Sequence, residues 1–129
     1  MVNVAELEGI TSHHIEQLHT QGIHTTGQLL ERSATATERM HLADTAHLDL
    51  SQLEELVHMA DLCRVADITQ AHVRQLYDIG VYSIPKLAYR RPATLYEQLA
   101  AQSPRHHPSM VQLEAYIAHA KRLKKMLHH

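Results

Sequence analysis

The stretch Val65–Leu87 decides the fold and reads V-A-D-I-T-Q-A-H-V-R-Q-L-Y-D-I-G-V-Y-S-I-P-K-L. A similar stretch at Leu7–Leu29, 58 residues earlier, reads L-E-G-I-T-S-H-H-I-E-Q-L-H-T-Q-G-I-H-T-T-G-Q-L. The identical pairs under this shift are Ile10 and Ile68, Thr11 and Thr69, His14 and His72, Gln17 and Gln75, Leu18 and Leu76, Gly22 and Gly80, and Leu29 and Leu87. A duplicated helical hairpin is therefore the predicted unit of the chain.

Each copy carries the start and stop signals of a short helix. Thr11 or Ser12 in the first copy and Thr69 in the second suit the N-cap, because a side-chain oxygen there accepts a backbone N–H. Gly22 and Gly80 suit the position after the last helical residue, where a positive φ is cheap for glycine. These signals predict one helix from His13 to about Thr20 and another over Gln70–Ile79.

Longer amphipathic helices are predicted after each hairpin. Apolar residues recur at three- and four-residue steps over 52–66, and Ser109 with Gln112 forms a capping box for a long last helix. The expected buried stripe of this last helix is Met110, Leu113, Tyr116, Ile117, Ala120, Leu123 and Leu127. Short helices are expected over 4–8, 27–31, 38–43, from Ser83 onward and over 92–101, with a loop at 102–108.

The predicted fold class is all-α. A shift of 57 to 60 residues aligns the later helices as well, so internal repeats are predicted at about 4–66 and 62–127. We expect about nine helices, packed as one compact domain over residues 1–129. The composition agrees, since Trp and Phe are absent and there are only 4 Gly and 4 Pro.

The two hairpins resemble the helix-hairpin-helix module in the phrases Gly9-Ile10 and Gly22-Ile23-His24-Thr25 and in their later counterparts. The duplicated arrangement is similar to a bacterial family of unknown function built from two such modules. The resemblance implies the fold but brings no established chemistry with it.

Many helix-hairpin-helix modules bind DNA phosphates through a G-apolar-G turn at a helix N-terminus. The corresponding residues are Gly9, Ile10 and Thr11 in the first copy and Asp67, Ile68 and Thr69 in the second. Threonine replaces the second glycine in both copies, and Asp67 would repel a phosphate. Of the two interpretations, nucleic-acid binding and a retained structural joint, this pattern favours the joint.

Little in the sequence indicates catalysis, a cofactor or a metal site. None of the 13 His forms a pair at the i, i+3 or i, i+4 spacing of a helical metal site, so surface histidines are expected. Adventitious metal binding at His106-His107 or His128-His129 stays an alternative. Cys63 is expected on a buried helix face, and no G-x-S-x-G turn or glycine-rich phosphate loop is present. We expect no enzyme activity.

The expected location is the cytoplasm. No apolar run approaches the roughly 20 residues of a membrane span, and the start M-V-N-V-A-E-L lacks the features of a secretory signal. No membrane partner is expected.

Charge is divided unevenly between the halves of the chain. Residues 1–66 carry ten acids and three bases, whereas residues 67–129 carry four acids and nine bases, within a net charge of −2. The candidate binding patch consists of Arg90, Arg91, Arg105, Lys121, Arg122, Lys124 and Lys125. Four interpretations of this patch are open. It is a solvated helix end, or it binds an acidic protein partner, nucleic-acid phosphate, or the acidic half of a second copy. We expect a non-catalytic protein-interaction or scaffold module, with weak sequence-independent nucleic-acid binding as the alternative.

Overall fold

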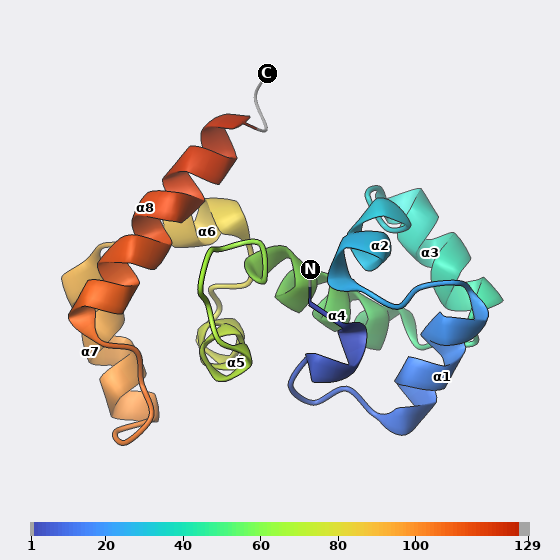
Figure 1. Ribbon diagram of the computed structural model, residues 1–129, viewed down its shortest axis with the longest axis horizontal. Helices are drawn as coiled ribbons and strands as arrows, with labels where there is room; N and C mark the ends of the chain where they lie inside the picture. The colour runs from blue at the N-terminus through green and yellow to red at the C-terminus, as the bar shows by residue number, and fades with distance from the viewer. Residues whose placement is uncertain (1, 127–129) are drawn as a thin grey trace. The chain divides into compact units, whose positions relative to one another are not determined.

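The computed structural model describes residues 2–126, and every regular element within them is helical (Figure 1). In chain order the elements are the 3₁₀ helix η1 (Val4–Glu6), α1 (Ser12–Thr20), α2 (Thr26–Glu31), α3 (Ala36–Thr45), α4 (Leu50–Leu62), α5 (Gln70–Asp78), α6 (Ile84–Ala88), α7 (Pro92–Gln102) and α8 (Met110–Met126). The chain divides into two compact units, residues 1–61 and 62–129. The prediction that they form a single domain stays a prediction.

In the first unit, the N-terminal segment is fastened to the start of α2. The Val4 N–H donates to the His24 carbonyl at 2.9 Å, and the Thr26 N–H donates to the Val2 carbonyl at 2.8 Å. These bonds bury Val4 against the end of the hairpin. The fully buried side chains of this unit include Leu18, Ile23, Leu29, Leu42 and Leu53.

The first hairpin enters α1 through Gly9, which has a φ of 85°. The Thr11 Oγ1 then accepts the His14 N–H at 3.2 Å, which confirms Thr11 as the N-cap. At the other end of α1, Gly22 has a φ of 76°, and the Ile23 N–H bonds to the Leu18 carbonyl at 3.0 Å. This bond and that from Gly22 to His19 form a Schellman motif, so Gly22 ends the helix as predicted.

The second hairpin repeats these bonds at positions 58 residues later. Asp67 takes the left-handed conformation of Gly9 with a φ of 61°, and Thr69 Oγ1 accepts the His72 N–H at 3.1 Å. Gly80 has a φ of 88°, and the Val81 N–H bonds to the Leu76 carbonyl at 2.9 Å. The backbone therefore follows the same course in both hairpins.

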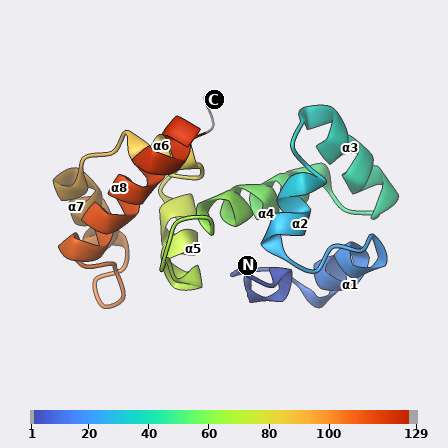
Figure 2. The same cartoon turned by 45° about the horizontal axis from the view of Figure 1, so that its top comes forward.

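The rest of the second unit packs around α8, which lies against α6 and α7 (Figures 1 and 2). The capping box at its start is confirmed, since Ser109 Oγ accepts the Gln112 N–H at 3.1 Å and Gln112 Oε1 accepts the Ser109 N–H at 2.9 Å. The predicted stripe is buried at Leu113, Tyr116, Ile117 and Ala120 and half-buried at Met110 and Leu123, while Leu127 lies outside the described residues.

Several predicted helix bounds were wrong. The helix predicted over 4–8 is only the 3₁₀ turn Val4–Glu6, because the chain must turn at Gly9. The helix predicted to reach residue 66 ends at Leu62, since the chain must already turn toward the left-handed Asp67.

The other differences concern α3 and Cys63. Helix α3 begins at Ala36, two residues before the predicted start at 38, because Thr35 supplies the cap to Glu38. Cys63 is half-buried rather than buried, because α4 ends one residue before it and its Sγ lies 3.6 Å from the side-chain amide of Gln70.

Candidate functional site

A groove with a basic rim lies between the C-terminal end of α6 and the C-terminal part of α8. Its lining residues are Ala88, Tyr89, Lys121, Lys124 and Lys125, and its volume is about 210 Å³. The two helices lie side by side in both views (Figures 1 and 2). Because Lys121, Lys124 and Lys125 follow at three- and four-residue steps, α8 presents all three ammonium groups to the same side. We call these five residues the Tyr89 groove.

Tyr89 gives this groove an exposed aromatic surface. Its side chain is 73% exposed, although the neighbouring Leu87 and Ala88 are buried. The Lys124 Nζ lies 3.7 Å from the centre of the Tyr89 ring and also donates to the Tyr89 hydroxyl. A cation over a ring face is attracted by the ring's quadrupole. These contacts hold the ring and the ammonium group together at the surface.

The structure places some of the predicted patch beside the groove and some away from it. Arg90 and Arg91 directly follow Tyr89, and the Arg90 guanidinium donates to Gln98 on α7. Arg122 is exposed on α8. Arg105, however, follows the opposite end of α7, a helix about 16 Å long at 1.5 Å per residue. The Tyr89 groove therefore contains three of the seven predicted cations. In the chain, Arg90 and Arg91 directly follow Tyr89, and Arg122 directly follows Lys121.

Tyr89 itself was absent from the predicted patch. The signal that could have found it is the sequence Tyr89-Arg90-Arg91, in which an aromatic residue directly follows the last buried residues of a short helix. An exposed aromatic side chain within a basic segment is a common feature of binding surfaces.

At the start of each hairpin helix, two of the N–H groups that could bind a phosphate are engaged within the chain. In the first unit the Thr11 N–H donates to His14 Nδ1 at 3.4 Å, while the His14 N–H donates to Thr11. In the second unit Thr69 Oγ1 takes the His72 N–H, and the Thr69 N–H bonds to the Tyr116 hydroxyl. The helix starts are thus capped by their own side chains, with Asp67 beside the second.

Two histidines contradict the expectation of surface histidines. His14 and His72 are each only 8% exposed, and each bonds to the long helix of its own unit. His14 Nε2 lies 3.2 Å from Gln52 Oε1 on α4, and His72 Nδ1 lies 2.9 Å from Tyr116 Oη on α8. Burial lowers the pKa of His72, and the nearby His107 lowers it further.

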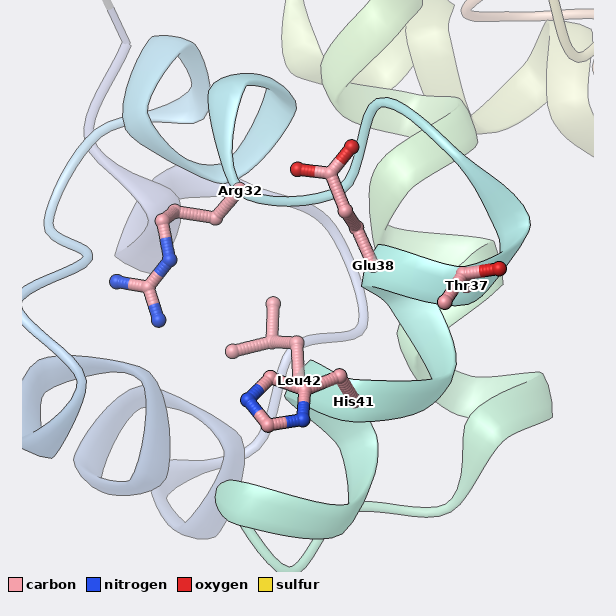
Figure 3. A pocket seen from close by; sticks show the side chains of 5 residues that line it. All are labelled: Arg32, Thr37, Glu38, His41 and Leu42. Atoms are coloured by element: carbon pink, nitrogen blue, oxygen red, sulfur yellow. The ribbon is translucent and has the colours of Figure 1, made fainter.

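A second cavity, in the first unit, was not predicted. It has a volume of about 300 Å³ and is lined by Arg32, Thr37, Glu38, His41 and Leu42. Figure 3 shows Arg32 entering from the end of α2, while the other four side chains come from α3. The Arg32 guanidinium donates to the Gln21 carbonyl at 2.8 Å, which holds it at the edge of this cavity. Acid and base are mixed here, so the cavity favours neither sign of charge.

The described part of the chain carries neither a metal cluster nor a helix fit to cross a membrane. Within residues 2–126, no group of three His, Cys, Asp or Glu side chains is placed to hold a metal ion. His128 and His129 lie outside these residues. None of the described helices combines the length and the apolar character that crossing a membrane requires.

Comparison with known proteins gives one match. No curated protein and no solved structure matches the chain. The family described as "Domain of unknown function (DUF4332)" matches residues 8–123, which includes the turns of both hairpins and, of the Tyr89 groove, Ala88, Tyr89 and Lys121. The chain therefore belongs to the DUF4332 family.

Proposed function

We propose that this protein is a non-catalytic helical interaction module built from two degenerate helix-hairpin-helix units, with a cytoplasmic role. The repeat is supported by hydrogen bonds that recur 58 residues apart, including the caps at Thr11 and Thr69 and the Schellman motifs at Gly22 and Gly80. In this proposal both hairpins serve as structural joints. Their engaged N–H groups and Asp67 support that role.

The observation that carries the proposal is the Tyr89 groove. An exposed ring surrounded by three ammonium groups fits a partner that offers carboxylates around an apolar side chain. Aromatic residues are enriched among the few side chains that dominate binding energy, and complementary charge raises the association rate and orients the partner. The proposed partner is therefore an acidic protein surface.

The second candidate function is weak, sequence-independent nucleic-acid binding at the same groove. The observation that favours it is the exposed Tyr89 ring, because bases stack on aromatic side chains while lysines follow the phosphates. Against it, the Lys124 ammonium already covers one face of the ring, and neither hairpin offers unoccupied N–H groups at Thr11 or Thr69. We therefore place it second.

Capture of partners by the immobilised full chain tests the proposal. The baits are the wild type, Tyr89→Ala, Lys121→Glu/Lys125→Glu and the control Arg105→Glu, exposed to nuclease-treated extract of the source cells. We expect wild type and control to retain the same acidic proteins at moderate salt, and the two groove variants to lose them. Equal retention by the groove variants would contradict the proposal.

A gel-shift titration tests the alternative. Random duplex and single-stranded oligonucleotides are titrated with the wild type and with a Lys121/Arg122/Lys124/Lys125→Ala variant at several salt concentrations. The proposal predicts no shift, or the same shift with both proteins. A shift that the variant loses and that weakens steeply with salt would instead support nucleic-acid binding, because phosphate contacts release counterions.

A further inference from the structure

We infer that the Tyr89 groove binds the acidic first unit of a second copy of this chain, at the first turn of α4. The contact residues on that side are Asp49, Leu50 and Glu54. The inference rests on the proposed function, because it names the partner of the same groove.

The division into compact units sharpens the charge separation of the chain. Residues 1–61 carry ten acids and two bases, a net charge of −8, while residues 62–129 carry four acids and ten bases, a net charge of +6. Each unit is thus strongly charged, although the whole chain carries only −2. Copies meeting through unlike units attract each other, whereas contact between like units is repulsive.

Two large exposed apolar side chains lie in the described part of the first unit, Met40 at 60% and Leu50 at 36%. Met40 follows the base Arg39, whereas Leu50 follows the acid Asp49. Among the described residues, the large exposed apolar side chains are Met40, Leu50, Tyr89 and Val111. Leu50 lies between Asp49, its neighbour in the chain, and Glu54, one helical turn later. This turn therefore offers an apolar side chain between two carboxylates. The groove offers the complement, a ring among ammonium groups.

The Asp49 carboxylate is fixed in the charged form at this turn. Its Oδ1 accepts the Ser51 N–H at 2.9 Å, the Ser51 hydroxyl at 2.5 Å and the Gln52 N–H at 3.3 Å. The Ser51 hydroxyl and these backbone donors lower the pKa of Asp49. The charge is therefore held in one place at the helix start, and less side-chain freedom is lost on binding.

This contact joins two different surfaces, so the interface is head-to-tail. A pair joined by one such contact still has one free groove and one free acidic turn, and assembly continues until a ring closes or a filament grows. The smallest closed form is a dimer in which each groove holds the acidic turn of the other copy. The inference therefore predicts a mass that rises with concentration and falls with salt, because the groups at the contact are exposed charges.

Complementary charge variants of the full chain test the contact. Variant one is Lys121→Glu/Lys125→Glu in the groove. Variant two is Asp49→Asn/Glu54→Lys, in which asparagine keeps the helix cap. Arg105→Glu and Glu16→Lys are the controls, and circular dichroism checks that every protein folds. Sedimentation velocity of nuclease-treated protein measures assembly at low and high salt.

We expect the wild type and both controls to associate at low salt and to separate at high salt. Each contact variant alone should stay monomeric. An equimolar mixture of the two should associate, because the unchanged acidic turn of variant one fits the unchanged groove of variant two, and the reversed groove of variant one fits the reversed turn of variant two. A wild type that stays monomeric, or a mixture without rescue, would overturn the inference. Salt-dependent capture of another acidic protein by the groove would in that case leave the proposed function standing.

Discussion

The Nδ1 atom of His72 lies 2.9 Å from the hydroxyl oxygen of Tyr116, and this bond joins the second hairpin to α8. The backbone of Thr69 also hydrogen-bonds to Tyr116. In the first unit the Thr11 N–H reaches His14 Nδ1 directly at 3.4 Å. The tyrosine hydroxyl thus bonds to both Thr69 and His72 in the second unit. The corresponding residues of the first unit, Thr11 and His14, bond to each other directly.

The first prediction concerns stability at low pH. Burial and His107 hold the pKa of His72 below its ordinary value of 6.5 in the folded chain. The unfolded chain therefore binds more protons below about pH 6.5, so the free energy of unfolding should fall as the pH is lowered through this value. It should level off once the pH is below the folded-state pKa.

Urea unfolding between pH 5 and 8 measures this effect. The groups facing His72 are Tyr116 and His107. Burial also lowers the pKa of His58, so His58 should add to the fall in the free energy of unfolding at low pH. His72→Asn keeps an acceptor near Nδ1 and should reduce the pH dependence, whereas the exposed His41→Asn should not. An unchanged slope in His72→Asn would show that this histidine does not set the pH dependence.

The second prediction is that Tyr116→Phe destabilises the chain. The ring would still fill the core, but His72 Nδ1 and the Thr69 N–H would lose their shared partner. Leaving buried polar groups unsatisfied costs about 1–3 kcal/mol. Thermal and urea unfolding measure the loss, and Tyr96→Phe, on the partly exposed α7, is the control. An equal effect of both substitutions would contradict this role of the hydroxyl.

The third prediction concerns the left-handed positions. Gly22→Ala and Gly80→Ala should each cost about 1 kcal/mol, because a Cβ at these φ values of 76° and 88° is strained although nothing lies within 4 Å of it. Asp67→Gly should have the opposite sign, since glycine relieves the strain at a φ of 61°. Unfolding free energies of the three variants test this prediction. Stabilisation by Gly80→Ala would contradict the positive φ of Gly80.

The fourth prediction separates binding from folding at the groove. Tyr89 and Lys121 are exposed, so Tyr89→Ala and Lys121→Glu should change the unfolding free energy by no more than about 0.5 kcal/mol. Binding of the partner should nevertheless be lost. Differential scanning calorimetry measures the stability of each variant, and the capture experiment measures its binding to the partner. A large stability loss in Tyr89→Ala would mean that the ring serves the fold rather than a partner.

The helices and caps were predictable from the sequence because their signals are local. Thr11, Thr69, Gly22 and Gly80 act within one helical turn, and the pattern of Ser109 and Gln112 forms the capping box it indicates. His14 and His72 were misjudged because histidine is common at surfaces and only the facing long helix supplies the bonds that bury it.

The groove depends on contacts between distant residues and was only partly predictable. Lys121 and Lys124 were recognisable as a basic helix end, but Tyr89 comes beside them only because α6 packs on α8. Arg105 was grouped with them because charge was counted along the chain, whereas α7 separates it in space. The cavity beside Arg32 carries no periodic signal in the sequence.

The most direct test of the Tyr89 groove is a ¹H–¹⁵N correlation spectrum of the full chain, titrated with a short poly-glutamate peptide. An acidic ligand bound at the groove should shift the amides of 88–91 and 121–125 and leave those of Arg105 and the two hairpins unchanged. Shifts spread equally over Arg64, Arg74, Arg105 and the groove would instead show unspecific attraction between charges. That result would contradict the central claim that this groove is the binding surface.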